Sequence, residues 1–134
     1  MIDFGCVKQL SDTFVDTLPR LLNAFARNDA DGVFAAYRQL GMEHKSAPPD
    51  FYAQVLRPFG EWVSRPLQKD AFDFGKHSDY TSQAREIIHN LAKTSGLNKV
   101  ADEFVFFDRT VYGLCKIFER MGATVKIRQH WVNE

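Results

Sequence analysis

The sequence has few cysteines, no long apolar run and no net charge. Its two cysteines, Cys6 and Cys115, stand far apart in no Cys-x-x-Cys pair, so we expect each to be a small buried apolar side chain and not part of a disulfide scaffold. No apolar stretch approaches the roughly 20 residues that cross a bilayer. The 17 basic residues equal the 17 acidic residues, so no long-range field attracts nucleic acid. We therefore expect a cytoplasmic protein that binds no nucleic acid.

Common catalytic motifs are also missing from the sequence. It contains neither a Walker A loop nor a Gly-x-Ser-x-Gly elbow. Glu86 and His89 have the spacing used by carboxylate-bridged di-metal bundles, but no second Glu-x-x-His pair accompanies them, so we predict an exposed surface pair. Arg109 lies in a very apolar segment beside Asp108 and near Glu103, which predicts an internal ion pair.

What the sequence contains is enough apolar material for one helical core. Its 134 residues are 45% hydrophobic and include 12 phenylalanines, which predicts a single domain over residues 1–134. The first residues form a short extended segment, and after them apolar side chains recur with a helical period. We predict an all-α fold of about five helices, which cover roughly residues 11–27, 29–41, 50–65, 79–95 and 104–121.

The fifth predicted helix is the most apolar. Its stripe runs from Phe104 to Met121, and Val105, Phe106 and further apolar residues widen it, so we expect this helix to be central and nearly surrounded. Gly113 lies in its middle, where glycine costs about 1 kcal/mol relative to alanine. We expect another backbone to pass close to Gly113 and to account for that cost.

The tripeptide Asp-Phe-Gly occurs twice, beginning at Asp3 and at Asp73. In kinase-like folds this tripeptide follows a strand, and its aspartate holds the Mg²⁺ that bridges the phosphates of ATP. Asp3 follows the short apolar segment Met1–Ile2, whereas Asp73 lies in a polar loop between two predicted helices. We therefore take Asp3 as the candidate metal ligand and expect Asp73 to be structural.

A longer pattern resembles the UbiB/AarF family of atypical protein-kinase-like proteins. The first part, residues 2–7 with Leu10, is similar to the family's metal-binding motif and the turn after it. The segments 57–59 and 72–75 resemble its Pro-Phe and Phe-Asp-Phe-Gly stretch. The segment 103–109, followed by Gly113 and by residues 120–123, is similar to its C-terminal helix and closing turn. The resemblance covers nearly the whole chain but only the C-terminal part of the family's domain.

The resemblance implies the C-terminal lobe of a kinase-like fold and, for the intact family protein, Mg²⁺ and ATP binding, atypical kinase or ATPase chemistry, a part in ubiquinone biosynthesis and contact with a membrane surface. Of the family's functional residues only Asp3 is carried over, as the Mg²⁺ ligand. The nucleotide loop, the ATP-contacting lysine and the catalytic loop precede that motif in the family and are not found here. We therefore expect a fragment or truncated gene product that is inactive alone, binds no cofactor and has no catalytic residue of its own.

Two other interpretations remain open. In the first, the chain is a non-enzymatic helical module that binds a protein or a lipid. In the second, it is the product of a decayed reading frame and has no function. Two observations favour the interaction module. The chain is rich in aromatic residues, and the surface that the missing nucleotide lobe would cover stays exposed. We expect the chain to hide that surface by forming a two-fold homodimer.

Overall fold

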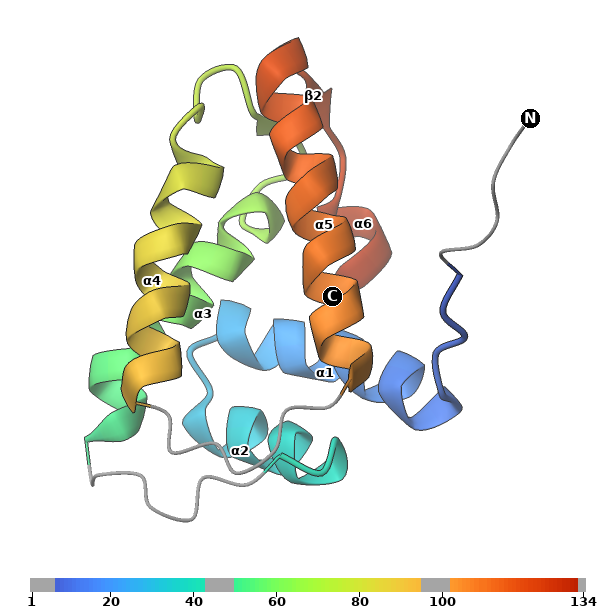
Figure 1. Cartoon of the computed structure of the whole chain (residues 1–134), viewed down its shortest axis with the longest axis vertical. Coiled ribbons are helices and arrows are strands. Elements are labelled where there is room, and N and C mark those ends of the chain that lie inside the picture. The colour runs from blue at the N-terminus through green and yellow to red at the C-terminus, as the bar shows by residue number, and fades with distance from the viewer. Residues whose placement is uncertain (1–6, 43–49, 95–101, 133–134) are drawn as a thin grey trace.

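The computed structural model describes residues 7–42, 50–94 and 102–132, which are mostly helical (Figure 1). In chain order the elements are α1 (Asp12–Ala26), α2 (Ala30–Gln39), the π-helical turn η1 (Tyr52–Leu56), α3 (Arg57–Ser64), the 3-10 turn η2 (Arg65–Leu67), β1 (Phe72–Asp73), α4 (Tyr80–Thr94), α5 (Asp102–Met121), β2 (Thr124–Val125) and α6 (Arg128–Trp131). The predicted all-α fold of about five helices is confirmed. The five predicted helices correspond to α1, α2, α3 with its flanking turns, α4 and α5.

Local capping groups set the ends of the first two helices. Ser11 Oγ accepts a hydrogen bond from the backbone N–H of Phe14 (3.2 Å) at the start of α1. Asp29 Oδ1 accepts one from the N–H of Gly32 (3.0 Å) at the start of α2. Gly41 follows α2 with a φ of 74°, the left-handed conformation in which glycine commonly ends a helix. These boundaries agree with the sequence because each is decided by neighbouring residues.

Prolines have different effects in α1 and in the third predicted helix. α1 continues through Pro19 as one element. The third helix is divided, because η1 precedes α3 and the N–H of Arg57 donates to the carbonyl of Tyr52, five residues earlier. Pro58 has no N–H, and in a regular α-helix its ring would crowd the carbonyl of Gln54. The wider π turn before Pro58 relieves that crowding.

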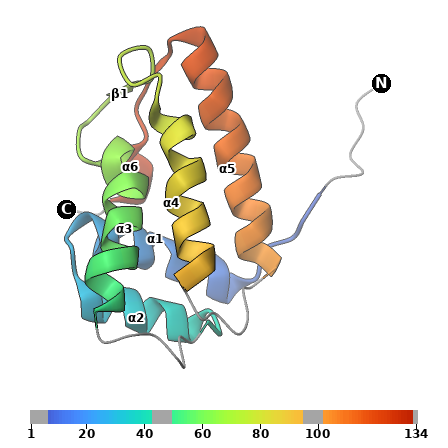
Figure 2. The ribbon, with the colours of Figure 1, turned by 60° about the vertical axis from the view of Figure 1, so that its left-hand side comes forward.

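The main hydrophobic core lies among α1, α2, η1 and α3. Its buried members are Leu21, Ala24, Phe25, Val33, Ala36, Tyr37, Met42, Phe51 and Leu56. A second cluster joins the loop around β1 to α4 and α5 through Phe72, Phe74, Tyr80 and Cys115. Both clusters leave α5 on the outside of the molecule, beside α4 (Figure 2).

The prediction that α5 is central and nearly surrounded is wrong. Cys115 is the buried residue of α5 within the part of the chain that the structure describes. Phe106, Leu114, Ile117 and Met121 are 37%, 46%, 53% and 71% exposed. The apolar stripe is wide because the inner side of α5 packs on the protein while a second apolar face points outward. Periodicity cannot distinguish these two faces, since both contribute apolar residues to the same stripe.

Among the described residues, no backbone passes close to Gly113, contrary to the expectation. A Cβ atom built on Gly113 would meet no atom within 4 Å. The intrinsic cost of glycine in a helix is therefore not explained by packing within the described residues.

A two-residue ladder that the sequence did not predict closes the end of α5. β1 pairs antiparallel with β2, with Phe72 opposite Val125, and the N–H of Phe74 donates to the carbonyl of Ala123 (2.9 Å). The backbone comes very close here, because a Cβ on Gly75 would lie 3.3 Å from Cα of Gly122. Gly122 itself has a φ of 61° and ends α5 as predicted.

The C-terminal tail is anchored by Trp131. The indole of Trp131 meets Phe107 edge to face, with ring centroids 6.2 Å apart. Asn23 Nδ2 donates to the carbonyl of Trp131 (2.9 Å), and Arg128 Nη1 donates to the carbonyl of Leu67 (2.8 Å). No helix in the described residues has the length and apolar character that crossing a membrane requires. The predicted extended segment at residues 1–6 lies outside the described residues.

Candidate functional site

The two Asp-Phe-Gly tripeptides can be compared only in part. Asp3, the predicted magnesium ligand, and Cys6 lie outside the described residues. Asp73 Oδ1 accepts hydrogen bonds from the backbone N–H groups of Gly75 (2.9 Å) and Lys76 (3.1 Å), and so holds a turn. The structural role predicted for Asp73 is therefore confirmed. No group of three His, Cys, Asp or Glu side chains within the described residues is placed to hold a metal ion.

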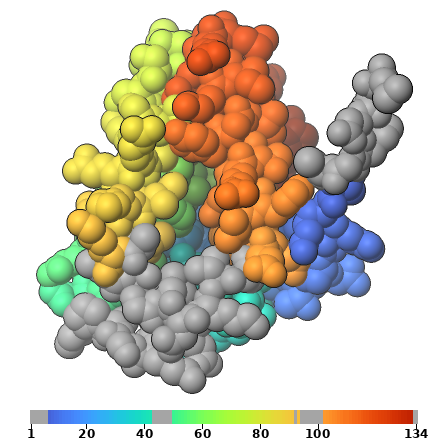
Figure 3. All heavy atoms as spheres, viewed as in Figure 1, coloured from blue at the N-terminus to red at the C-terminus, as the bar shows by residue number. Residues whose placement is uncertain are grey.

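The surface is hollowed between α4 and α5 (Figure 3). We call the wide part of this hollow the outer cleft; Arg85, Glu86, His89 and Arg109 line it. Glu86 and His89 are exposed, as predicted for a surface pair. The outer cleft thus carries charges of both signs and opens to solvent.

The internal ion pair predicted for Arg109 is wrong, because Arg109 is exposed and lines the outer cleft. Glu103 instead accepts hydrogen bonds from the backbone N–H (2.7 Å) and the hydroxyl (2.9 Å) of Ser11. The carboxylate of Glu103 therefore joins the start of α5 to the start of α1. Sequence proximity suggested Arg109 as the partner of Glu103, because Ser11 lies far from Glu103 along the chain.

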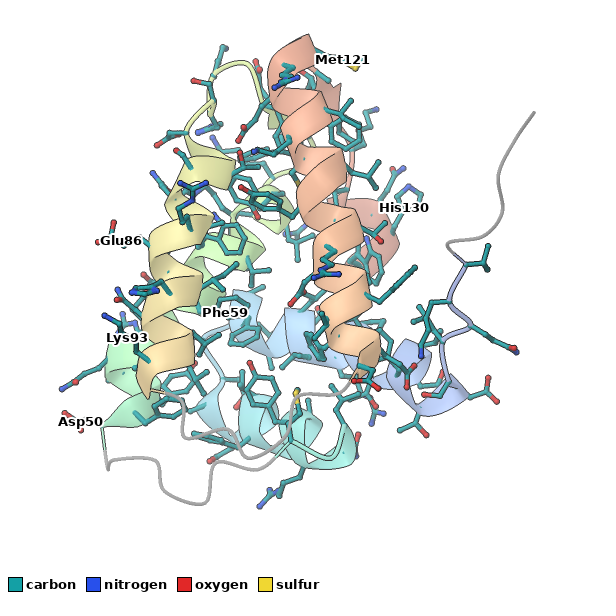
Figure 4. The ribbon with its side chains drawn as sticks, viewed as in Figure 1. Asp50, Phe59, Glu86, Lys93, Met121 and His130 are labelled. Carbon is teal, nitrogen blue, oxygen red and sulfur yellow. The ribbon has the colours of Figure 1, made fainter. Side chains whose placement is uncertain are left out.

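A smaller inner cavity of about 140 Å³ lies beneath the outer cleft. Elements α1, α3, η2, α4, α5 and α6 line it, and its aromatic walls are formed by Phe59, Trp62, Tyr80, Phe107, Tyr112 and Trp131. Figure 4 shows Phe59 in the interior between α4 and α5. The lining is almost entirely apolar, so the cavity is suited to holding an apolar group.

The rings of the inner cavity are fixed by contacts around them. Trp62 stacks on Tyr80 with ring centroids 4.9 Å apart, and its Nε1 donates to the Tyr80 carbonyl (2.8 Å). The guanidinium group of Arg65 lies over the ring of Tyr80, 5.7 Å from its centroid. Burial raises the pKa of the Tyr80 hydroxyl well above its ordinary value. The pair is therefore a rigid, uncharged wall.

Asp108 lies where the outer cleft meets the inner cavity, and it lines both. The residue as a whole is exposed, since its outer surface borders the open cleft. Its carboxyl group is nevertheless desolvated by the surrounding side chains, which raises its pKa from 3.8 to about 6. Burial, and secondly the charge of Asp108, raise the pKa of Tyr37 on α2 well above its ordinary value. Asp108 is thus an acid held in a poorly solvated position.

Cys115 forms part of the cavity wall and is only 7% exposed, as predicted for a small buried side chain. Burial, and secondly the nearby Glu119 carboxylate, raise the pKa of its thiol to about 11. A thiol that stays protonated at neutral pH is a poor nucleophile. The carboxylate of Glu119 accepts hydrogen bonds from the N–H and the hydroxyl of Thr81 (both 2.6 Å) and so caps α4. Glu119 therefore has a structural role, and Cys115 contributes a protonated thiol to the cavity wall.

The sequence did not reveal this site, because its walls come from six elements that are spread along the chain. Comparisons with protein-family models, curated proteins and solved structures found no match to this chain.

The second surface of interest is the outer face of α5. Phe106, Leu114, Ile117 and Met121 recur at helical spacing along it, with the bare backbone of Gly113 beside them, and we call this face the α5 ridge. Nothing covers α5 in the view of Figure 3. Met121 projects from its far end, on the side away from α4 (Figure 4).

Proposed function

We propose that this chain is a non-catalytic helical interaction module that self-associates through the α5 ridge. The observation that carries the proposal is the row of exposed apolar side chains on one face of α5, which is interrupted by the exposed Thr110 between Phe106 and Leu114. Scattered exposed apolar residues are normal on protein surfaces, but several of them along one face of a helix are typical of an interface.

Gly113 supports a second helix as the occupant of the α5 ridge. A glycine without a neighbour gives up about 1 kcal/mol of helix stability, and its missing side chain leaves a flat place where another backbone can approach. Gly113 lies near the middle of the ridge, between Phe106 and Met121. A two-fold pair of α5 helices would cross there, and each ridge would cover the other.

We further propose that the chain belongs among the UbiB/AarF-like proteins as a counterpart of their helical C-terminal lobe. Support comes from the resemblance of segments 2–7, 72–75 and 103–109 and from the compatible all-α architecture. In an intact kinase-like protein the α5 ridge would pack against the remaining domain. Phosphoryl transfer needs a lysine, a catalytic loop and bound metal acting together, so we expect no such chemistry from this chain alone.

Sedimentation equilibrium over a range of concentrations tests the self-association. We expect a reversible monomer–dimer equilibrium for the wild-type chain. Ile117→Glu should weaken the dimer by at least about tenfold, because it buries an unpaired carboxylate in the interface. Val15→Glu is the matched control, since Val15 on α1 is as exposed as Ile117 but lies off the ridge. A wild-type chain that stays monomeric at high concentration would contradict the proposal.

An ATP hydrolysis assay tests whether the chain is non-catalytic. We expect the purified chain with Mg²⁺ to release phosphate no faster than a denatured sample. The informative pair of variants is Asp3→Ala and Asp73→Ala, because Asp3 is the predicted metal ligand and Asp73 holds a turn. Hydrolysis by the wild-type chain that is lost in Asp3→Ala and kept in Asp73→Ala would overturn the proposal in favour of an active kinase-like enzyme.

A further inference from the structure

The inner cavity has the size of a single aromatic ring. Its volume is about 140 Å³, and an engineered apolar protein cavity of about 150 Å³ is known to bind benzene. The rings of Trp62, Tyr80, Phe107 and Trp131 form much of its wall. Hydrogen bonds to backbone carbonyls help to hold Trp62, Tyr80 and Trp131 in place. The cavity therefore needs little rearrangement to receive a flat apolar group.

The charge at the cavity is negative. Asp108 is the one residue with a charged side chain among the described residues that line the inner cavity. No hydrogen bond or ion pair to its carboxylate occurs among the described ranges of the chain. Arg85 and Arg109 line the outer cleft, which Asp108 also borders, but they do not line the cavity. A ligand seated in the cavity therefore meets a carboxylate first.

We propose that the inner cavity binds a small amine that carries one aromatic ring, with the ring among the aromatic walls and the ammonium group on Asp108. The raised pKa of Asp108 agrees with this, because a desolvated carboxylate gains more from a cationic partner than a solvated one does. This inference does not depend on the α5 ridge or on self-association.

Three probes of the same shape separate the contributions of ring and charge. Benzylamine is protonated at neutral pH, benzyl alcohol is neutral and benzoate is an anion. We would titrate each into the ¹⁵N-labelled wild-type chain at pH 7.5 and low salt and follow the backbone amide signals. We expect benzylamine to bind about fivefold more tightly than benzyl alcohol, as expected for a partly solvated charge pair, and benzoate to bind most weakly. The shifts should be largest around Tyr80, Phe107 and Cys115.

Two variants separate the ring site from the charge. Asp108→Asn should bind benzylamine and benzyl alcohol equally well. Val111→Phe should abolish the binding of both, because Val111 lines the cavity while being 38% exposed, so a larger ring can occupy the cavity without entering the packed core. Val15→Phe is the control for Val111→Phe, since it makes the same exchange on α1 away from the cavity.

The outcomes divide clearly. Preference for benzylamine that is lost in Asp108→Asn supports the proposal. Tightest binding of benzoate would overturn it and assign the selectivity to the arginines of the outer cleft. Equal binding of all three probes, or no binding of any probe at about 10 mM, would also overturn it, since good fragment-sized ligands reach the millimolar range.

Discussion

At the scale of single residues, Asp108 is the group whose surroundings matter most. It lies in the helix that presents both the ridge and the cavity wall, and apolar side chains take the place of water on one side of its carboxyl group. Its folded-state pKa of about 6 lies above the ordinary 3.8, because the charged form is disfavoured there. The folded chain therefore binds a proton at Asp108 more readily than the unfolded chain does.

This linkage predicts the pH dependence of stability. The contribution of Asp108 to stability is fully present below about pH 4 and is lost as the pH rises through about 6, since the unfolded chain has already released the proton. Asp108→Asn removes this loss. We expect the variant to be more stable than the wild-type chain at pH 7 and the difference to shrink on going to pH 4, as measured by urea denaturation.

Comparing the unfolding free energies of the wild-type chain and Asp108→Asn isolates the effect of Asp108 from that of other groups that titrate in the same pH range. A difference in unfolding free energy that stays constant from pH 4 to pH 7 would show that its carboxyl group is fully solvated. A difference that grows toward acid pH would mean that a positive group stabilises the carboxylate.

Residue roles were predictable where they depend on nearby sequence. The structural role of Asp73 followed from its polar loop, and burial of Cys115 followed from its isolation in an apolar helix. The partner of Glu103 was not predictable, because Ser11 reaches it only through the packing of α1 against α5. The poorly solvated position of Asp108 was not predictable either, because the sequence shows only that its neighbours are apolar.

At the scale of elements, α5 and the β1–β2 corner show opposite uses of glycine. Gly113 has open space around its Cβ position, whereas a Cβ on Gly75 would press on the backbone of Gly122. Backbone atoms cannot turn aside as the end of a flexible side chain can. Replacing glycine by alanine should therefore change the stability of the monomer in opposite directions at Gly113 and Gly75.

We expect Gly113→Ala to stabilise the monomer by about 1 kcal/mol through helix propensity. Gly75→Ala should destabilise it by about 1 kcal/mol or more through overpacking at the corner. Thermal and urea unfolding at low protein concentration would measure both. Destabilisation by Gly113→Ala would mean that a neighbour already occupies the space beside that residue in the monomer.

Helix positions could be predicted from the sequence, because caps such as Ser11 and Asp29 and stops such as Gly41 and Gly122 act locally. The split of the third helix could not be placed, although its cause, Pro58, is visible in the sequence. The β1–β2 ladder was missed because each strand is only two residues long and its partner lies far along the chain.

At the scale of the whole molecule, α5 lies between a cavity on one side and open solvent on the other. An apolar stripe indicates that a helix is buried by something, but it does not say whether the partner is in the same chain. The hydrophobic residues of α5 were therefore identified correctly, while its central position was wrong. The inner cavity could not be foreseen, since it exists only when six elements meet.

The central claim is that the α5 ridge is covered by a second copy of this chain. The most direct test is a dilution series of amide NMR spectra on the ¹⁵N-labelled wild-type chain. The account predicts concentration-dependent shifts at Phe106, Gly113, Leu114, Ile117 and Met121, with none at Val15 on α1. Spectra that do not change with concentration, or that change at α1 and not along α5, would contradict it.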